Sequence, residues 1–172
     1  MARSLSGTKA KVAKRQTLNP PAGKAKSKLG PVCADDIELV KSPGSRERGG
    51  GPGGEAWIIL VNGRRAGAAY INIVDDSIRG KHASFHVFLN RPSQGRQIGR
   101  IAYQRCCGLS QHDVVYAHMR KSNTASRKAA EHAGFVDATG PDDSQLVLIW
   151  RRPIAERIEK AVVGSDGVNH SR

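Results

Sequence analysis

The segment from residue 90 to residue 107, NRPSQGRQIGRIAYQRCC, constrains the fold more than any other part of the chain. An apolar run at 85–89, FHVFL, leads into it, and apolar residues then recur at helical spacing from 97 to 110. Glycines and arginines therefore lie where a strand passes into a helix. A helix N-terminus carries unpaired N–H groups and a partial positive charge, so this junction predicts a site for a ligand that bears phosphate.

Apolar runs and turn residues on both sides of this junction predict an α/β fold with a mixed sheet. Asn62 and Gly63 both tolerate a positive φ, so they predict a tight hairpin between two strands. A strand, a helix and a second strand within 82–119 predict a βαβ crossover. We expect the Gly-rich segment at 43–55 to be a flexible linker. The predicted strands cover 36–42, 56–61, 65–74, 82–90, 114–119, 135–138 and 145–151, and the predicted helices cover 97–110 and 124–133.

The ends of the chain differ in composition from its middle. Residues 1–30 contain eight of the 28 Lys and Arg residues and no Asp or Glu, so they carry most of the net charge of +13. We predict a disordered basic tail at 1–31, one folded domain at 32–155 and a C-terminal tail at 156–172. The sequence has neither an apolar run long enough to cross a membrane nor the apolar centre of a signal peptide, which predicts a cytoplasmic protein.

The three cysteines are odd in number and lack the spacing of metal ligands. Cys106 and Cys107 are adjacent, so on a helix their side chains point about 100° apart, and we expect that they do not share one core or one metal. We predict that they and Cys33 are reduced thiols with structural roles, and we predict no metal site.

Three motifs resemble those of the GNAT superfamily of N-acetyltransferases. The segment QGRQIG at 94–99 is similar to the family's central motif, with Gln94 and Gly99 at its first and last positions and Gln97 where the middle glycine belongs. Downstream, NTASRKAAEHAGF at 123–135 resembles the family's stretch from an asparagine to a closing Gly-Phe. Upstream, NGRRAGAAYINI at 62–73 resembles its hairpin. The three motifs occur in the family's order, and the resemblance extends from about residue 55 to residue 152.

This resemblance implies a mixed, splayed sheet flanked by helices, with the family's first two helices missing because only 43–55 separates the first two strands. It also implies acetyl-CoA as cofactor and a primary amine as acceptor. The strands on either side of the first helix would part to admit the cofactor, and a backbone N–H near Leu89 would polarise the thioester carbonyl. The cofactor-binding residues implied are Leu89, Gln94, Gly95, Arg96, Gln97, Ile98, Gly99, Arg100 and Asn123.

The residues for acid and base catalysis are less direct to assign. The family often has a tyrosine before the closing Gly-Phe as general acid, but this chain has Ala130 there, so we expect Ala130→Tyr to raise turnover. Tyr116 and His132 are the substitute donors that we consider. His86 lies on the strand before the glycine motif, and its pKa range suits a general base. The catalytic candidates are therefore His86 and Tyr116.

Two other functions remain open from the sequence. The lysine-rich tail would bind nucleic acid without sequence preference, although it lacks aromatic residues for base stacking. Gln97 and Ala130 depart from the family pattern, which would also suit an acyl-CoA sensor without turnover. The acceptor would be a small molecule or a protein amine, in a groove that is open or completed by the second subunit of a homodimer.

Overall fold

The computed structural model describes residues 29–157 of the 172-residue chain. Most of the predicted tails, 1–28 and 158–172, lie outside the described residues. No helix within residues 29–157 is long and apolar enough to span a membrane.

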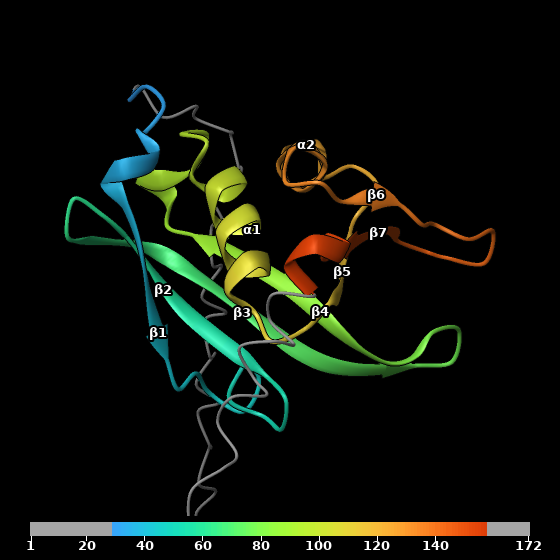
Figure 1. Ribbon diagram of the computed structural model, residues 1–172. Coiled ribbons are helices and arrows are strands. Elements are labelled where there is room, and N and C mark those ends of the chain that lie inside the picture. The colour runs from blue at the N-terminus through green and yellow to red at the C-terminus, as the bar shows by residue number, and fades with distance from the viewer. Residues whose placement is uncertain (1–28, 158–172) are drawn as a thin grey trace, which may run out of the picture.

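Seven strands form one mixed sheet in the order β1-β2-β3-β4-β5-β7-β6 (Figure 1). All neighbouring pairs are antiparallel except β4 and β5, which are parallel and joined through α1. This confirms the predicted α/β class and crossover. The strands are β1 Ile37–Ser42, β2 Glu55–Val61, β3 Arg64–Asp76, β4 Gly80–Leu89, β5 Val114–Met119, β6 Val136–Asp137 and β7 Leu146–Arg151; the helices are α1 Ile98–Leu109 and α2 Thr124–His132, with 3-10 turns η1 Ala34–Asp36 and η2 Arg91–Ser93.

The strands β4 and β5 separate almost as soon as they meet. Their register contains one pair, Ser84 with Tyr116. Beyond it, the C-terminal part of β4 pairs only with β3, and β5 pairs with β7. The sheet is therefore splayed between β4 and β5, as the resemblance implied.

The Gly-rich segment between β1 and β2 is a compact loop, so the prediction of a flexible linker was wrong. The backbone N–H of Gly49 donates to the Asn72 side chain at 2.8 Å, and the Asn72 amide donates to the Glu47 carbonyl at 2.8 Å. A Cβ on Gly49 would lie 2.1 Å from the Glu55 carbonyl oxygen. Glycine here permits a close approach of backbone to backbone. The segment contains no helix, so the family's first two helices are indeed missing.

Helix α1 lies across one face of the sheet (Figure 1). Its buried residues, Ile98, Ala102, Tyr103, Cys106 and Cys107, form a wide apolar face. Phe85 of β4 contacts Tyr103 of α1, with ring centroids 4.6 Å apart. Cys106 and Cys107 are both fully buried in this core, so the expectation that adjacent cysteines could not share it was wrong. A buried helix face about 100° wide can include two adjacent rows of residues spaced four positions apart. Ala102 and Cys106 form one such row, and Tyr103 and Cys107 form the other, so both cysteines face the core.

Candidate functional site

A cleft of about 760 Å³ opens where the splayed strands meet the two helices. Its walls come from the end of β4, the loop after it, the first turns of α1, and α2 with its N-cap. Segments more than forty positions apart in sequence thus share one cavity. The lining residues are Val87, Phe88 and Leu89; Gln94, Gly95 and Gln97; Gly99, Arg100 and Tyr103; and Asn123, Ala125, Ser126, Lys128, Ala129 and His132.

The loop before α1 turns sharply so that the helix N-terminus faces the cleft. Gly95 has φ +75° and Gln97 has φ +63°, both in the left-handed region. Gln97 is the N-cap of α1, and its side chain makes no capping hydrogen bond. Asn90 holds the start of the loop, because its side chain accepts from the backbone N–H of Ser93 at 3.2 Å. The first N–H groups of α1 therefore remain available to a ligand anion.

Arg100 supplies a second feature that suits an anion. Its Nε is buried and has no hydrogen-bond partner among the described residues. A buried guanidinium N–H without a partner is costly, and a phosphate oxygen would satisfy it. Lys128 adds a second positive charge from α2. The unpartnered Arg100 Nε, an observation from the structure and not from the sequence motif, therefore indicates that the cleft suits a pyrophosphate group.

The structure brings together most of the predicted cofactor residues, and two stand apart. Ile98 is fully buried, so only its backbone can meet a ligand in the cleft. Arg96 does not line the cleft, and its Nε donates to the Gly30 carbonyl at 3.2 Å. Asn123 lines the cleft and also caps α2 by accepting from the Ser126 N–H at 3.2 Å. Ser126 and Lys128 also line the cleft, and sequence reasoning missed them because no local pattern indicates which face of α2 meets the glycine loop.

The end of β4 presents backbone groups to the gap beside β5. The Asn90 N–H donates to the Ala66 carbonyl on the β3 side at 2.9 Å. Because backbone groups alternate along a strand, the Leu89 N–H and carbonyl point to the other side, into the gap. In agreement with this, the Gln94 side chain, which lines the cleft, donates to the Leu89 carbonyl at 3.0 Å. The Leu89 N–H therefore points into the gap between β4 and β5, and its role toward a thioester stays a prediction.

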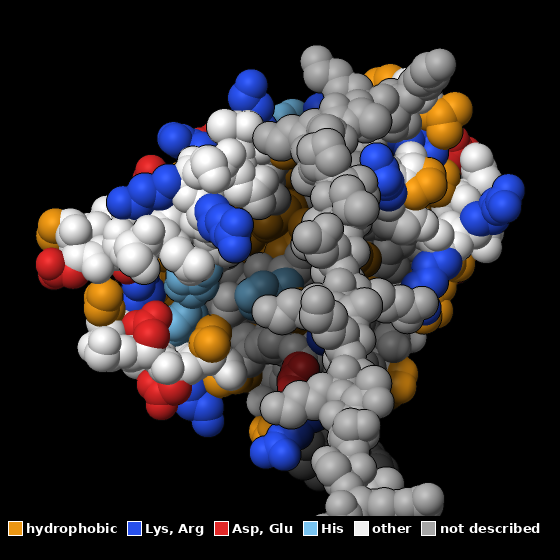
Figure 2. Space-filling model, turned by 180° about the vertical axis from the view of Figure 1, so that it is seen from behind, with side chains coloured by type: hydrophobic (Ala, Val, Ile, Leu, Met, Phe, Trp, Pro, Cys, Tyr) orange, Lys and Arg blue, Asp and Glu red, His pale blue; other side chains and the backbone are white. Residues whose placement is uncertain are grey.

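Polar side chains gather on the face of the sheet turned away from α1. Phe85 of β4 contacts Tyr103 of α1. Because side chains alternate along a strand, Ser84 and His86 point to the opposite face of the sheet. Figure 2 shows histidine side chains collected on that face. We call this group the histidine face; its members are His82, Ser84 and His86 of β4 and Tyr116 and His118 of β5.

A hydrogen-bonded chain of three side chains crosses the gap on the histidine face. The Ser84 hydroxyl lies 3.3 Å from His86 Nε2 and 3.1 Å from His118 Nδ1. The His86 ring stacks on Tyr70 with centroids 5.0 Å apart. Burial lowers the pKa of His86, which keeps the imidazole neutral near pH 7. Phe88, two positions further along the strand, lines the cleft, whereas His86 itself does not.

The other catalytic candidate, Tyr116, lies beside these three hydrogen-bonded side chains and does not line the cleft either. Its ring contacts that of His82, with centroids 4.8 Å apart. His132, by contrast, lines the cleft from α2.

Ala130 is fully buried in the core and does not line the cleft. A tyrosine there would overpack the core, which typically costs about 1 to 3 kcal/mol. The structure therefore contradicts the expectation that Ala130→Tyr would supply an acid to the site.

Comparison with known proteins agrees with this geometry. The model of the acetyltransferase (GNAT) family matches residues 32–135, which is more than half of the chain. Among solved structures, the aminoglycoside acetyltransferase AAC(6′)-Ib in complex with coenzyme A and kanamycin is similar with a TM-score of 0.51 and 19% identity, over 62% of this chain and 72% of that chain. A GNAT family acetyltransferase from Streptococcus agalactiae is similar with a TM-score of 0.50 and 13% identity, over 57% and 65%.

A search of curated proteins finds no match. The two solved structures share the fold, and the family model covers the strand, loop and helices that build the cleft. The chain therefore belongs to the GNAT acetyltransferase family.

Proposed function

We propose that the protein is an N-acetyltransferase that moves an acetyl group from acetyl-CoA to a primary amine. The observation that carries the proposal is the cleft at the splay, which is lined by an uncapped helix N-terminus and by Arg100, whose Nε has no partner among the described residues. Family membership supports acyl transfer, and the geometry supports a ligand with a pyrophosphate.

The cofactor would be held by groups that already line the cleft. The N–H groups at the start of α1 and the Arg100 guanidinium would bind the pyrophosphate, and Lys128 of α2 would add a further positive charge. The gap between β4 and β5 would accept the pantetheine arm, whose amides resemble a peptide strand. Bound acetyl-CoA would supply the thioester carbon to which the amine nitrogen bonds as the thiolate leaves. The Leu89 N–H would donate to the carbonyl oxygen at that carbon.

The acceptor would approach from the histidine face, where no helix from the segment between β1 and β2 covers the sheet. His86 would take the proton of the incoming ammonium at Nδ1. That assignment requires Nε2–H to donate to the Ser84 hydroxyl, which in turn donates to His118 Nδ1. The lowered pKa of His86 leaves the ring neutral and able to accept a proton.

The test is a panel of small amines, polyamines and peptides with free amino groups, each assayed for CoA release and for the acetylated product by mass spectrometry. Binding of acetyl-CoA is measured separately by calorimetry. We expect stoichiometric CoA release with at least one amine. Tight binding of acetyl-CoA without release of CoA by any amine would reject the enzyme and favour a sensor.

Two pairs of variants test the cofactor site. A Cβ on Gly99 would meet the Ala129 Cβ at 4.0 Å, an ordinary contact, so Gly99→Ala should fold and bind. Gly99→Asp should weaken acetyl-CoA binding at least about fivefold, since like charges about 4 Å apart repel by roughly 1 to 4 kcal/mol between bulk water and a protein surface.

In the second pair, Arg100→Gln should weaken binding by roughly 10- to 100-fold, the usual value of a hydrogen bond to a charged group. Arg64→Gln removes an equal charge from the exposed hairpin and should leave binding unchanged. Equal affinities for Arg100→Gln and Arg64→Gln would place the cofactor elsewhere.

A further inference from the structure

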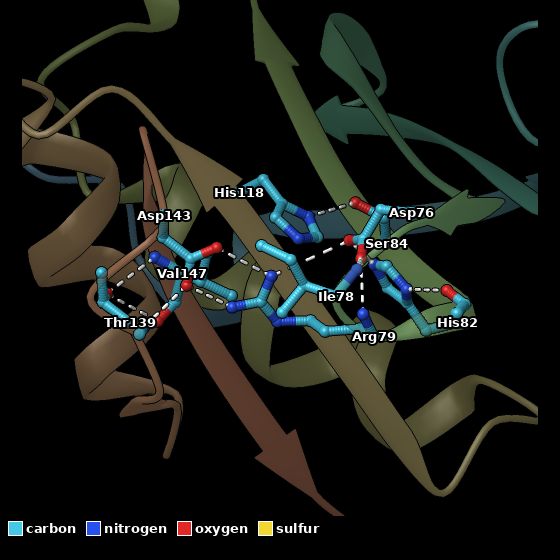
Figure 3. Close-up of polar contacts among 11 residues, drawn as sticks. Asp76, Ile78, Arg79, His82, Ser84, His118, Thr139, Asp143 and Val147 are labelled. Carbon is cyan, nitrogen blue, oxygen red and sulfur yellow. Dashed lines mark hydrogen bonds and ion pairs between the residues drawn. The ribbon is translucent and has the colours of Figure 1, made fainter.

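Three side chains that could bind a metal ion converge at one edge of the histidine face, and two of them belong to it. They are Asp76, at the end of β3, His82 of β4 and His118 of β5 (Figure 3). One potential ligand atom from each lies within 4.8 Å of the others. Imidazole nitrogen and carboxylate oxygen are the ligands that zinc and related divalent ions take in proteins.

The orientation of His82 is fixed by its own turn. Its Nδ1 lies 2.7 Å from the Gly80 carbonyl oxygen, which can only accept, so Nδ1 carries the proton. In the neutral ring, Nε2 is then a free lone pair. A backbone carbonyl that holds one imidazole nitrogen so that the other can bind a metal is a common arrangement around metal ligands.

The facing nitrogen atoms have no hydrogen-bond partners. His82 Nε2 and His118 Nε2 are both buried and unsatisfied among the described residues. The His82 side chain is only 6% exposed, and its Nε2 lies 3.7 Å from Asp76 Oδ2, beyond hydrogen-bond distance. Two buried imidazole nitrogens without partners next to one carboxylate are costly unless a further group completes the site.

The Asp76 carboxylate is held in place by the turn that follows it. Its Oδ1 accepts the backbone N–H groups of Ile78 at 2.9 Å and Arg79 at 2.6 Å. Its other oxygen, Oδ2, is the one that faces His82. The carboxylate is therefore oriented before any ion arrives.

We propose that Asp76, His82 and His118 form a binding site for a divalent transition-metal ion, with Zn²⁺ as the best match. Ligands of a tetrahedral ion with bonds of about 2.1 Å are about 3.4 Å apart. The separation of 3.7 Å between His82 Nε2 and Asp76 Oδ2 is close to this value, and a ligand atom of His118 lies within 4.8 Å of both residues. His82 also lines a hollow of about 720 Å³, together with Arg79 and Tyr116, so the site has an open space on the His82 side.

Arg79 is the positive charge that could oppose an ion here. Its NH1 lies 3.8 Å from Asp76 Oδ2, but its guanidinium is engaged through both nitrogens by Asp143. The charges of Arg79 and Asp143 therefore balance locally, and the Asp76 carboxylate remains to offset the ion.

An ion at this site would change which ring nitrogens of His118 and His86 carry a proton, because Ser84 links the two histidines by hydrogen bonds. Binding through His118 Nε2 places the His118 proton on Nδ1, which then donates to the Ser84 hydroxyl. That hydroxyl can donate only to His86 Nε2, so the His86 proton moves to Nδ1. If His86 Nδ1 is the base, as the proposed function holds, the ion will inhibit acetyl transfer.

The test is a calorimetric titration of the untagged full chain with ZnCl₂, together with visible absorption of the Co²⁺-loaded protein. We expect one ion per chain and the intense visible bands of low-coordinate Co²⁺. His82→Gln, His118→Gln and Asp76→Asn should each weaken binding by more than about 100-fold, because loss of an outer partner alone costs about 10- to 100-fold. Ser84→Ala, which removes such a partner, should fall in that lower range.

His132→Gln removes an exposed histidine on α2 and is the matched control, with expected affinity equal to wild type. Circular dichroism establishes that each variant is folded, and Zn²⁺ should raise the melting temperature of the wild type but not of His118→Gln. Absence of binding to the wild type, or wild-type affinity in His118→Gln, would overturn the metal site. Neither result depends on turnover, so the proposed function stands or falls separately.

Discussion

Arg152 fixes the C-terminal end of α1, and its replacement by methionine tests how the helix is held. The side chain follows β7 and is buried, with only 5% of the residue exposed. Its Nε donates to the Asp113 carboxylate at 2.8 Å. Its NH1 and NH2 donate to four backbone carbonyls at the end of α1 and just beyond it, those of Gly108 at 3.1 Å, Cys107 at 3.3 Å, Ser110 at 2.7 Å and His112 at 3.3 Å.

The expected loss of stability can be worked from these contacts. Removing one member of a buried ion pair costs about 3 to 5 kcal/mol, chiefly because the remaining charge stays buried. The Asp113 side chain is 48% exposed, so water will hydrate its carboxylate and the cost falls toward the lower limit. The carbonyls lose their charged donor and receive water only in part. We therefore expect Arg152→Met, which keeps the apolar stem, to lower the free energy of unfolding by about 3 kcal/mol.

The assay is urea unfolding followed by far-ultraviolet circular dichroism, with the melting temperature as a second measure. A loss of about 3 kcal/mol corresponds to a fall of roughly 6 to 12 °C for a domain of this size. Arg151→Met removes the exposed neighbouring charge and should change stability by less than about 0.5 kcal/mol. A loss below about 1 kcal/mol in Arg152→Met, or equal losses in both variants, would refute the reasoning.

Three further predictions follow from single residues. Burial raises the pKa of Cys107 to about 12 and raises that of Cys106 further, so Ellman's reagent at pH 8 should titrate only Cys33 until the chain is unfolded; a second fast thiol would contradict this. Gln97 has a left-handed backbone conformation, and Gln97→Gly removes its strain of about 1 to 2 kcal/mol. The greater freedom of glycine in the unfolded chain offsets about 0.4 to 1 kcal/mol of this gain. It should therefore stabilise modestly in urea, whereas Gln97→Ala should not. Because burial lowers the pKa of His86, the base stays neutral in mildly acidic solution, so His86→Gln should lose turnover most below pH 7; an unchanged pH–rate profile would exclude His86.

Local signals explain why much of the fold could be predicted from the sequence. The Asn62-Gly63 hairpin depends on two adjacent residues that accept a positive φ, and both have one. The helix 97–110 was predicted from apolar spacing and is observed at Ile98–Leu109. The position of the glycine-containing loop before α1 could also be predicted, because the strand, the glycines and the helix follow one another directly in the sequence.

Features that depend on distant pairing could not be found in this way. The histidine face requires the register of Ser84 with Tyr116, which no local pattern specifies. The role of Arg152 depends on carbonyls about forty positions earlier. The glycine content of 43–55 led to the incorrect prediction of a flexible linker. Glycine occurs both in flexible segments and where two backbones approach closely, as at Gly49.

Because β4 and β5 share a single residue pair, we expect the sheet to consist of two blocks that open separately. One block is the antiparallel series β1 to β4, and the other is β5, β7 and β6. Each block has a continuous hydrogen-bonded ladder, whereas the ladder between them consists of Ser84 and Tyr116. Units of this kind open with their own free energies, which native-state hydrogen exchange resolves. A ligand that bridges the gap would join the two blocks, so that amides of β4 and β5 exchange together in its presence and apart in its absence.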